Sequence, residues 1–138
     1  MISQLRDRIY QSLCQIELID PHTHINAHDP ASHTLVDILG YHYYAELAHS
    51  AGLGREQIED ESLSAKEKVG RLIEAIGAID NTIQYSWLID ICQRFFDFEG
   101  DRIDATNWEA LYDASESKMD NAQWADEVLR ISNVKSVF

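Results

Sequence analysis

The sequence has little proline, glycine or cysteine: its 138 residues include two prolines, six glycines and two cysteines. So few chain-breaking residues, together with 45% hydrophobic residues, exclude a disordered, collagen-like or low-complexity chain and predict one ordinary folded domain. The two cysteines, Cys14 and Cys92, are too few and too far apart for a zinc ribbon or a disulfide framework. Both lie in apolar helical patterns, so we expect buried free thiols and a cytoplasmic location.

Positive charge is scarce as well, because 24 acidic residues face 11 basic ones and the formal net charge is -13. Such a field repels phosphate backbones and anionic lipid headgroups, so we expect neither a nucleic-acid nor a membrane partner. No stretch approaches the ~20 apolar residues that span a bilayer. The first ten residues alternate charged and apolar side chains, which is not the pattern of a signal peptide.

Apolar residues recur at three- and four-residue steps along most of the chain, which predicts amphipathic helices. The first is expected at Ser3–Ile16. Two capping boxes are predicted, at Ser64–Glu67 and at Thr106–Glu109, and Asn81 is the predicted N-cap of the helix between them. The large aromatic side chains are expected to pack in the core; they are Trp87, Phe95, Phe96, Phe98, Trp108 and Trp124. The acidic run 56–61 is expected to be a solvated surface. Helices are also predicted at 34–39, 41–50 and 64–79, and from residues 81, 106 and 121 onward.

Two short segments have the composition of strands, Glu17–Asp20 and Asn133–Phe138. They are separated by more than a hundred mostly helical residues, which is the pattern of a βα unit with a large helical insertion. Because two strands do not form a stable sheet unaided, we expect the chain to be the front part of a longer protein.

The most informative residues are His22 and His24, directly after the first predicted strand. Residues two apart in a strand point to the same face, so both imidazoles could reach one divalent ion at ~2.0–2.1 Å. Two ligands do not complete a catalytic metal site, which usually has three protein ligands. From the spacing alone, a metal site and a pair of exposed or hydrogen-bonded histidines are equally good interpretations.

The order of a strand, Asp20-Pro-His22-Thr-His24 and a polar loop resembles the first barrel strand of the amidohydrolase superfamily. Within it the chain is most similar to uronate isomerases, which carry an Asp-His-Tyr triplet where this chain has Tyr41-His42-Tyr43. The resemblance implies an α/β TIM barrel of the metal-dependent hydrolase type. This chain would be the mainly helical N-terminal portion of that barrel domain, with a leading helix and first strand in 1–25, a helical insertion in 26–132 and the start of the second strand in 133–138.

The same resemblance implies the site and the activity. His22 and His24 would bind a divalent metal, with zinc the expected ion, which only the complete barrel is expected to retain. His28, His42 and Tyr43 would face the substrate. The expected reaction is the aldose–ketose isomerisation of a hexuronate, a small sugar acid. No catalytic base is identified, and this portion alone is expected to be inactive. Its exposed apolar surface would favour a homo-oligomer.

Two positions depart from the uronate isomerase pattern: Tyr41 replaces an aspartate and Glu46 replaces an arginine. A carboxylate near the site disfavours a hexuronate anion, so metal-dependent hydrolysis of an amide, ester or lactone is the alternative activity. A non-catalytic helical binding module is the second alternative.

Asp20 is a candidate for orienting His22.

Overall fold

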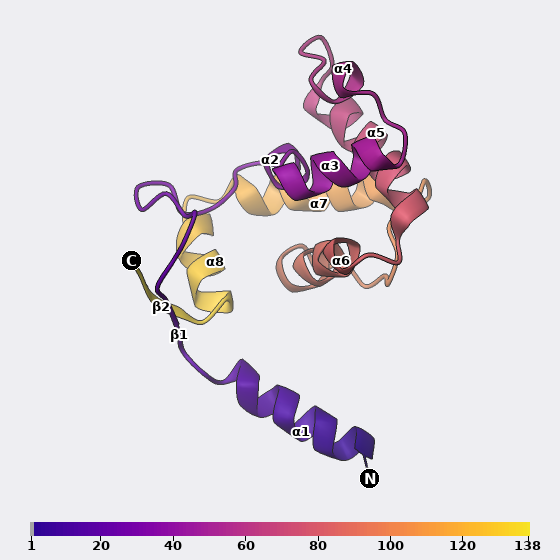
Figure 1. Ribbon diagram of the computed structural model, residues 1–138. Helices are drawn as coiled ribbons and strands as arrows, with labels where there is room; N and C mark the ends of the chain where they lie inside the picture. Colours follow the sequence, from indigo (N-terminus) through magenta and orange to yellow (C-terminus); the bar gives the residue numbers. More distant parts are fainter. Residues whose placement is uncertain (1) are drawn as a thin grey trace. The chain divides into compact units, whose positions relative to one another are not determined.

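The computed structural model describes residues 2–138, apart from the side chains of residues 2 and 3 (Figure 1). It divides the chain into two compact units. One combines the residues up to Ala31 with Gln123–Phe138, and the other is Ser32–Ala122. The first unit holds α1 (Ile2–Cys14), β1 (Leu18–Asp20), α8 (Trp124–Ile131) and β2 (Val134–Val137). The second holds α2 (Leu35–Leu39), α3 (His42–Ser50), α4 (Arg55–Ile58), α5 (Ala65–Ile76), the 3-10 turn Gly77–Ile79, α6 (Ile83–Phe95) and α7 (Trp108–Met119).

The predicted TIM barrel is wrong for this chain. A barrel of that type closes eight parallel strands, whereas the described residues form one sheet of two strands and are otherwise mostly helical. The two strands do lie where the sequence predicts them, and they pair in parallel. A parallel pair requires a long crossover connection, which Ser32–Ala122 supplies here as a helical unit with its own core.

Asn133 joins the two ends of the first unit. It ends α8 in the left-handed conformation, with φ of 54°, which asparagine tolerates better than most residues. Its side-chain amide donates to the carbonyl of Ile16 at 2.8 Å, and its own carbonyl accepts from the amide of Leu18 at 2.8 Å. These bonds align β1 beside β2, with Leu18 opposite Val134 and Asp20 opposite Val137.

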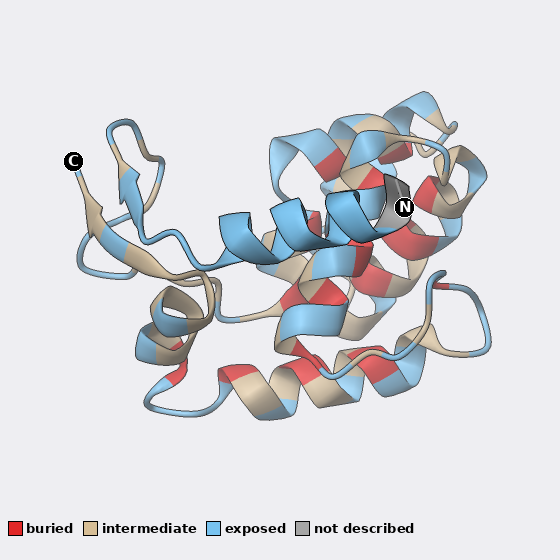
Figure 2. Ribbon diagram, turned by 90° about the horizontal axis from the view of Figure 1, so that it is seen from below, coloured by how far each residue is buried: buried red, intermediate tan, exposed pale blue. Residues whose placement is uncertain are grey.

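The helical unit packs around α5, which contacts α2, α3 and α7, while α6 packs against α7. Figure 2 shows the buried residues concentrated on the inner faces of these helices. Burial of such side chains is the main favourable contribution to folding. The apolar core of this unit consists of Leu35, Leu39, Tyr44, Ala48, Val69, Leu72, Ile73, Ile76, Tyr85, Leu88, Ile89, Cys92, Phe96, Ile103, Leu111 and Met119.

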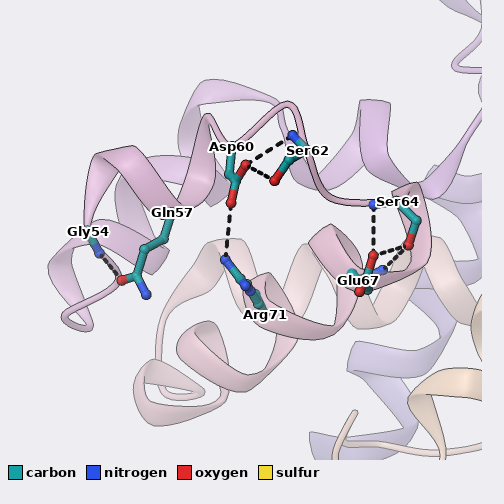
Figure 3. Close-up of polar contacts among 7 residues, drawn as sticks. All are labelled: Gly54, Gln57, Asp60, Ser62, Ser64, Glu67 and Arg71. Atoms are coloured by element: carbon teal, nitrogen blue, oxygen red, sulfur yellow. Dashed lines mark hydrogen bonds and ion pairs between the residues drawn. The ribbon is translucent and has the colours of Figure 1, made fainter.

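The first predicted capping box is confirmed. The Ser64 hydroxyl accepts from the Glu67 amide at 3.3 Å, and the Glu67 carboxylate accepts from the Ser64 amide at 2.9 Å (Figure 3). Immediately before it, Asp60 accepts two hydrogen bonds from Ser62 and forms an ion pair with Arg71 at 3.8 Å (Figure 3). These contacts fix the connection between α4 and α5.

The other two predicted helix caps are wrong. Thr106 does not cap α7, because its hydroxyl donates to the Asp104 carboxylate at 2.6 Å instead, and Asn107 becomes the N-cap residue. The N-cap of α6 is Thr82 and not Asn81, since the Thr82 hydroxyl accepts from the Tyr85 amide. Both errors arise where neighbouring residues offer competing side-chain oxygens.

The two cysteines have different environments. Cys92 is fully buried in α6, as expected, and burial raises the pKa of its thiol to about 12. Cys14 is exposed at the end of α1, so the expectation that it is buried is wrong.

Candidate metal centre

The segment after β1 is shaped by local hydrogen bonds to side chains. Asp20 ends the strand, and its carboxylate accepts from the backbone amide of His22 at 3.1 Å. One step further, the Thr23 hydroxyl accepts from the amide of Ile25 at 3.0 Å. Aspartate and threonine commonly form such turns with the amide two residues on. The turns stop the strand at Asp20, so His22 and His24 lie in the loop that follows and not in the strand itself.

The loop nevertheless keeps the alternation of an extended chain. His22 and His24 are exposed, whereas Thr23 and Ile25 are half-buried. The two imidazole rings lie edge to face, with centroids 5.3 Å apart and planes at 82°. The structure therefore places both histidines together on one accessible side of the loop, as the spacing predicts.

The donor chemistry of this pair suits a divalent metal, because neutral imidazole is a common ligand of zinc. The pair is half of a ligand set at most. Among residues 2–138 no group of three or more His, Cys, Asp or Glu side chains is placed to hold a metal ion. His22 and His24 fit the first two positions of a site, and the described residues do not complete it.

The contact of Asp20 with His22 is to the main chain and not to the ring. The Oδ1 atom of Asp20 binds the backbone amide of His22 and so fixes the turn of the main chain. This contact sets where the loop leaves β1, which is a positioning effect on the backbone.

His28 lies in a tight turn of its own. Asn26 and Asp29 form an isolated antiparallel bridge, and the Asp29 amide donates to the Asn26 carbonyl at 3.0 Å. The Asn26 side chain accepts from the His28 amide at 3.0 Å, which leaves the His28 side chain exposed at the tip.

The second group of predicted site residues lies in the helical unit, at the start of α3. Tyr41 precedes the helix without capping it through its side chain. The His42 ring lies 4.3 Å from the Tyr41 ring and 4.2 Å from the Tyr43 ring, centroid to centroid. Tyr41 and Tyr43 are edge to face at 5.3 Å. All three side chains are exposed, so the structure presents two phenol groups and an imidazole to solvent on one turn.

The next residue, Tyr44, differs from Tyr43 in its exposure to solvent. It is buried in the core, and burial raises the pKa of its phenol to about 12, with a smaller contribution from Cys92. Among these neighbouring tyrosines, Tyr44 therefore packs in the core, while Tyr43 is exposed to solvent. Glu46 is exposed one turn after His42, on the same side of α3.

One feature was not predicted from the sequence. A hollow of about 420 Å³ lies beside α6, where the loop before the helix and the loop after it meet. Arg102 donates to Asp80 across it at 3.0 Å. These charges come from separate loops, so no local spacing in the sequence reveals them. The hollow is lined by Asp80, Tyr85, Ser86, Ile89, Asp90, Asp101 and Arg102.

Comparison with known proteins gives no family assignment: no protein-family model matches the chain, and no curated protein is significantly similar to it. None of the helices described in residues 2–138 combines the length and the apolar character needed to cross a bilayer.

Proposed function

We propose that this chain contributes two metal ligands, His22 and His24, to a cytoplasmic metal-dependent enzyme that isomerises a sugar acid between its aldose and ketose forms. The observation that carries the proposal is the pair of exposed imidazoles, 5.3 Å apart on one side of the loop after β1. A divalent ion, with zinc the first choice, would polarise a substrate carbonyl and acidify the adjacent C–H bond. The resemblance to uronate isomerases supplies the reaction type.

The chain's own residues would act in binding. His42 and Tyr43 offer an imidazole and a phenol to solvent, which can donate and accept hydrogen bonds with the hydroxyl groups of a sugar acid. His28, at the tip of the Asn26–Asp29 turn, is a third candidate for substrate contact. None of them is proposed as the catalytic base.

The experiment is a zinc titration of the purified chain, monitored through the NMR signals of the histidine rings. We expect the His22 and His24 ring signals to shift together and the remaining histidines to stay unchanged. His22→Ala and His24→Ala should each abolish the response. His49→Ala is the matched control, since His49 is exposed in α3 and bonds the carbonyl of Leu53.

Zinc binding that survives the loss of both histidines would overturn the proposal. His22 and His24 ring signals that stay unchanged at a large excess of zinc would overturn it as well, and would favour a non-catalytic role for the helical unit. That unit has a core of its own, as an independent binding module requires.

Glu46 favours a second candidate function, metal-dependent hydrolysis of an amide, ester or lactone. Its carboxylate is exposed on the same side of α3 as His42 and Tyr43, where it would repel the carboxylate of a hexuronate. Substrate class separates the two functions. Binding of neutral amides or lactones in preference to glucuronate, lost in Glu46→Arg, would favour the hydrolase.

A further inference from the structure

A second hollow of the helical unit lies along the later turns of α5, and we call it the α5 hollow. Its volume is about 480 Å³, and all of its lining residues belong to Ser32–Ala122. One wall is formed by α5 and by Gly77, which ends this helix; the other is formed by the loop 102–105 and the start of α7. Binding sites for small molecules commonly have volumes of roughly 300–1,000 Å³.

Gly77 leaves room in this hollow. A Cβ atom at this position would meet nothing within 4 Å. The residue has φ of -59° and ψ of -24°, which is an ordinary helical conformation that any residue adopts. The backbone therefore does not require glycine here, and the missing side chain serves to keep the wall of the hollow open.

Trp108 provides an aromatic surface in the α5 hollow. Its ring approaches α5 so closely that a Cβ atom on Gly70 would lie 3.1 Å from it. The side chain is half-buried, so part of the indole remains accessible to solvent. Beside it, Ile73 and Ile103 are buried and line the hollow. A ligand in this place would contact an aromatic ring and an aliphatic floor together.

The charges that line the α5 hollow leave it negative. They belong to Glu74, Arg102 and Asp104. Arg102 is compensated, because it donates to Asp80 at 3.0 Å. Asp104 accepts hydrogen bonds from the amide and the hydroxyl of Thr106, and these bonds hold its pKa below the ordinary value, so it is ionised at neutral pH. Glu74 is exposed, and no residue of the described part of the chain forms an ion pair or hydrogen bond with its carboxylate.

A neighbouring hollow of about 360 Å³ shares Gly70 and Trp108 with the α5 hollow but differs in its charges. Its two cations are both paired. Lys66 contacts Glu109 at 3.4 Å, and Arg71 contacts Asp60 at 3.8 Å (Figure 3). These cations are therefore not available to neutralise the α5 hollow.

We infer that the α5 hollow binds a small organic cation whose charge is carried on an apolar or aromatic body. The cationic group faces Glu74 and Asp104, while the apolar body packs on Trp108 and Ile73. A cation near an indole ring is attracted by the negative face of the ring, and burial of the apolar body adds to the affinity. The net charge of -13 also raises the local concentration of cations. His22 and His24 take no part in this site, which is independent of the proposed metal site.

An NMR titration with benzyltrimethylammonium tests the site through the indole N–H signals of the three tryptophans. The Trp108 signal should shift along a saturating curve. Trp87 is 48% exposed on α6 and does not line the hollow, so its signal should stay unchanged. Phenylacetate has a similar ring and the opposite charge, and it should bind about tenfold or more weakly.

Two variants locate the bound cation. Gly77→Leu places a side chain in the hollow and should abolish the Trp108 shift, with thermal unfolding as the check that the fold is retained. Glu74→Gln should raise the dissociation constant about two- to fivefold, the range expected for an exposed ion pair. Glu61→Gln is the matched control, since it removes the same charge from an exposed position outside the hollow and should leave the dissociation constant unchanged.

A Trp108 signal that does not shift at millimolar benzyltrimethylammonium would overturn the inference. Equal shifts of Trp87 and Trp108, or equal affinity for phenylacetate, would overturn it as well. So would an unchanged affinity in folded Gly77→Leu, or equal effects of Glu74→Gln and Glu61→Gln. His22→Ala should bind the cation as wild type does, which keeps this test separate from the test of the metal site.

Discussion

The phenol of Tyr85 binds both backbone polar groups of Ile103. Its oxygen accepts from the Ile103 amide at 3.0 Å, and its hydroxyl donates to the Ile103 carbonyl at 3.3 Å. Both residues are buried, so one side chain of α6 satisfies a residue in the loop before α7. This contact fixes the loop that carries Asp101 and Arg102.

Tyr85→Phe should destabilise the helical unit by about 1–3 kcal/mol, because it leaves the buried amide and carbonyl of Ile103 without their partner. Urea unfolding followed by circular dichroism measures the change. Tyr41→Phe serves as the control, since Tyr41 is exposed, and it should have an effect below about 0.5 kcal/mol. Equal effects of the two substitutions would contradict the assigned role of Tyr85.

Ser64→Ala should lower stability by about 1 kcal/mol, the usual contribution of a serine N-cap. Hydrogen bonds from Ser64 hold the pKa of Glu67 below its ordinary value, so the substitution should also raise that pKa. A depressed carboxylate pKa stabilises the fold at pH values above the unfolded pKa of Glu67, and this stabilisation is lost as the pH falls through the folded value. An NMR titration of the Glu67 side chain measures the shift. No change in that pKa would show that the capping box is absent in solution.

Two glycine substitutions should differ in sign. A Cβ atom on Gly77 meets nothing within 4 Å, so Gly77→Ala should stabilise the fold by about 0.4–1 kcal/mol through the unfolded state. A Cβ atom on Gly70 would lie 3.1 Å from the Trp108 ring, and Gly70→Ala should be destabilising because α5 and α7 must separate. Thermal unfolding of both variants provides the comparison. A more stable Gly70→Ala would show that Trp108 adjusts freely.

Cys14 and Cys92 should react at different rates with a thiol reagent. The thiolate is the reactive form, and burial raises the pKa of Cys92 to about 12. Cys14 is exposed and should react within the mixing time or shortly after, whereas Cys92 should react only as fast as the helical unit opens. Stopped-flow absorbance with an aromatic disulfide reagent resolves the two phases, and Cys14→Ser should remove the fast one. A fast phase in which two thiols per molecule react would contradict the burial of Cys92.

Alkaline pH should destabilise the helical unit progressively through its buried phenol and thiol. Burial raises the pKa values of both Tyr44 and Cys92 to about 12, so the unfolded chain releases these protons at lower pH than the folded one. Their contribution to stability is complete below the unfolded values and is lost progressively from about pH 9 to about pH 12. Circular dichroism against pH measures this loss. Tyr44→Phe should shift the midpoint upward, and an unchanged midpoint would exclude Tyr44 from the transition.

Local patterns in the sequence predicted part of the local structure. Ser64 and Glu67 form the expected box because each side chain accepts from the other's backbone amide, whereas the hydroxyl of Thr106 donates to Asp104. His22 and His24 share one side, as two-residue spacing requires, although the strand ends before them. Spacing along the chain is enough to predict these features.

Features that depend on distant residues were predicted less well. Trp87 was expected in the core, but α6 has apolar residues on two sides and buries the side with Tyr85 and Leu88. Periodicity identifies both apolar sides of the helix but does not show which of them is buried. The barrel was expected from the resemblance of the residues around His22, and a short motif does not determine how many strands a chain contributes.

The parallel pairing of β1 with β2 has a consequence for the order of folding. Asn133 bonds a carbonyl 117 positions earlier in the chain, and closing so long a loop has a large entropic cost. The helical contacts of Ser32–Ala122 are nearer in sequence and form sooner. During synthesis, β1 leaves the ribosome first and remains without its neighbouring strand until the whole helical unit and β2 have followed. The loop with His22 and His24 is therefore among the last parts of the chain to acquire its final position.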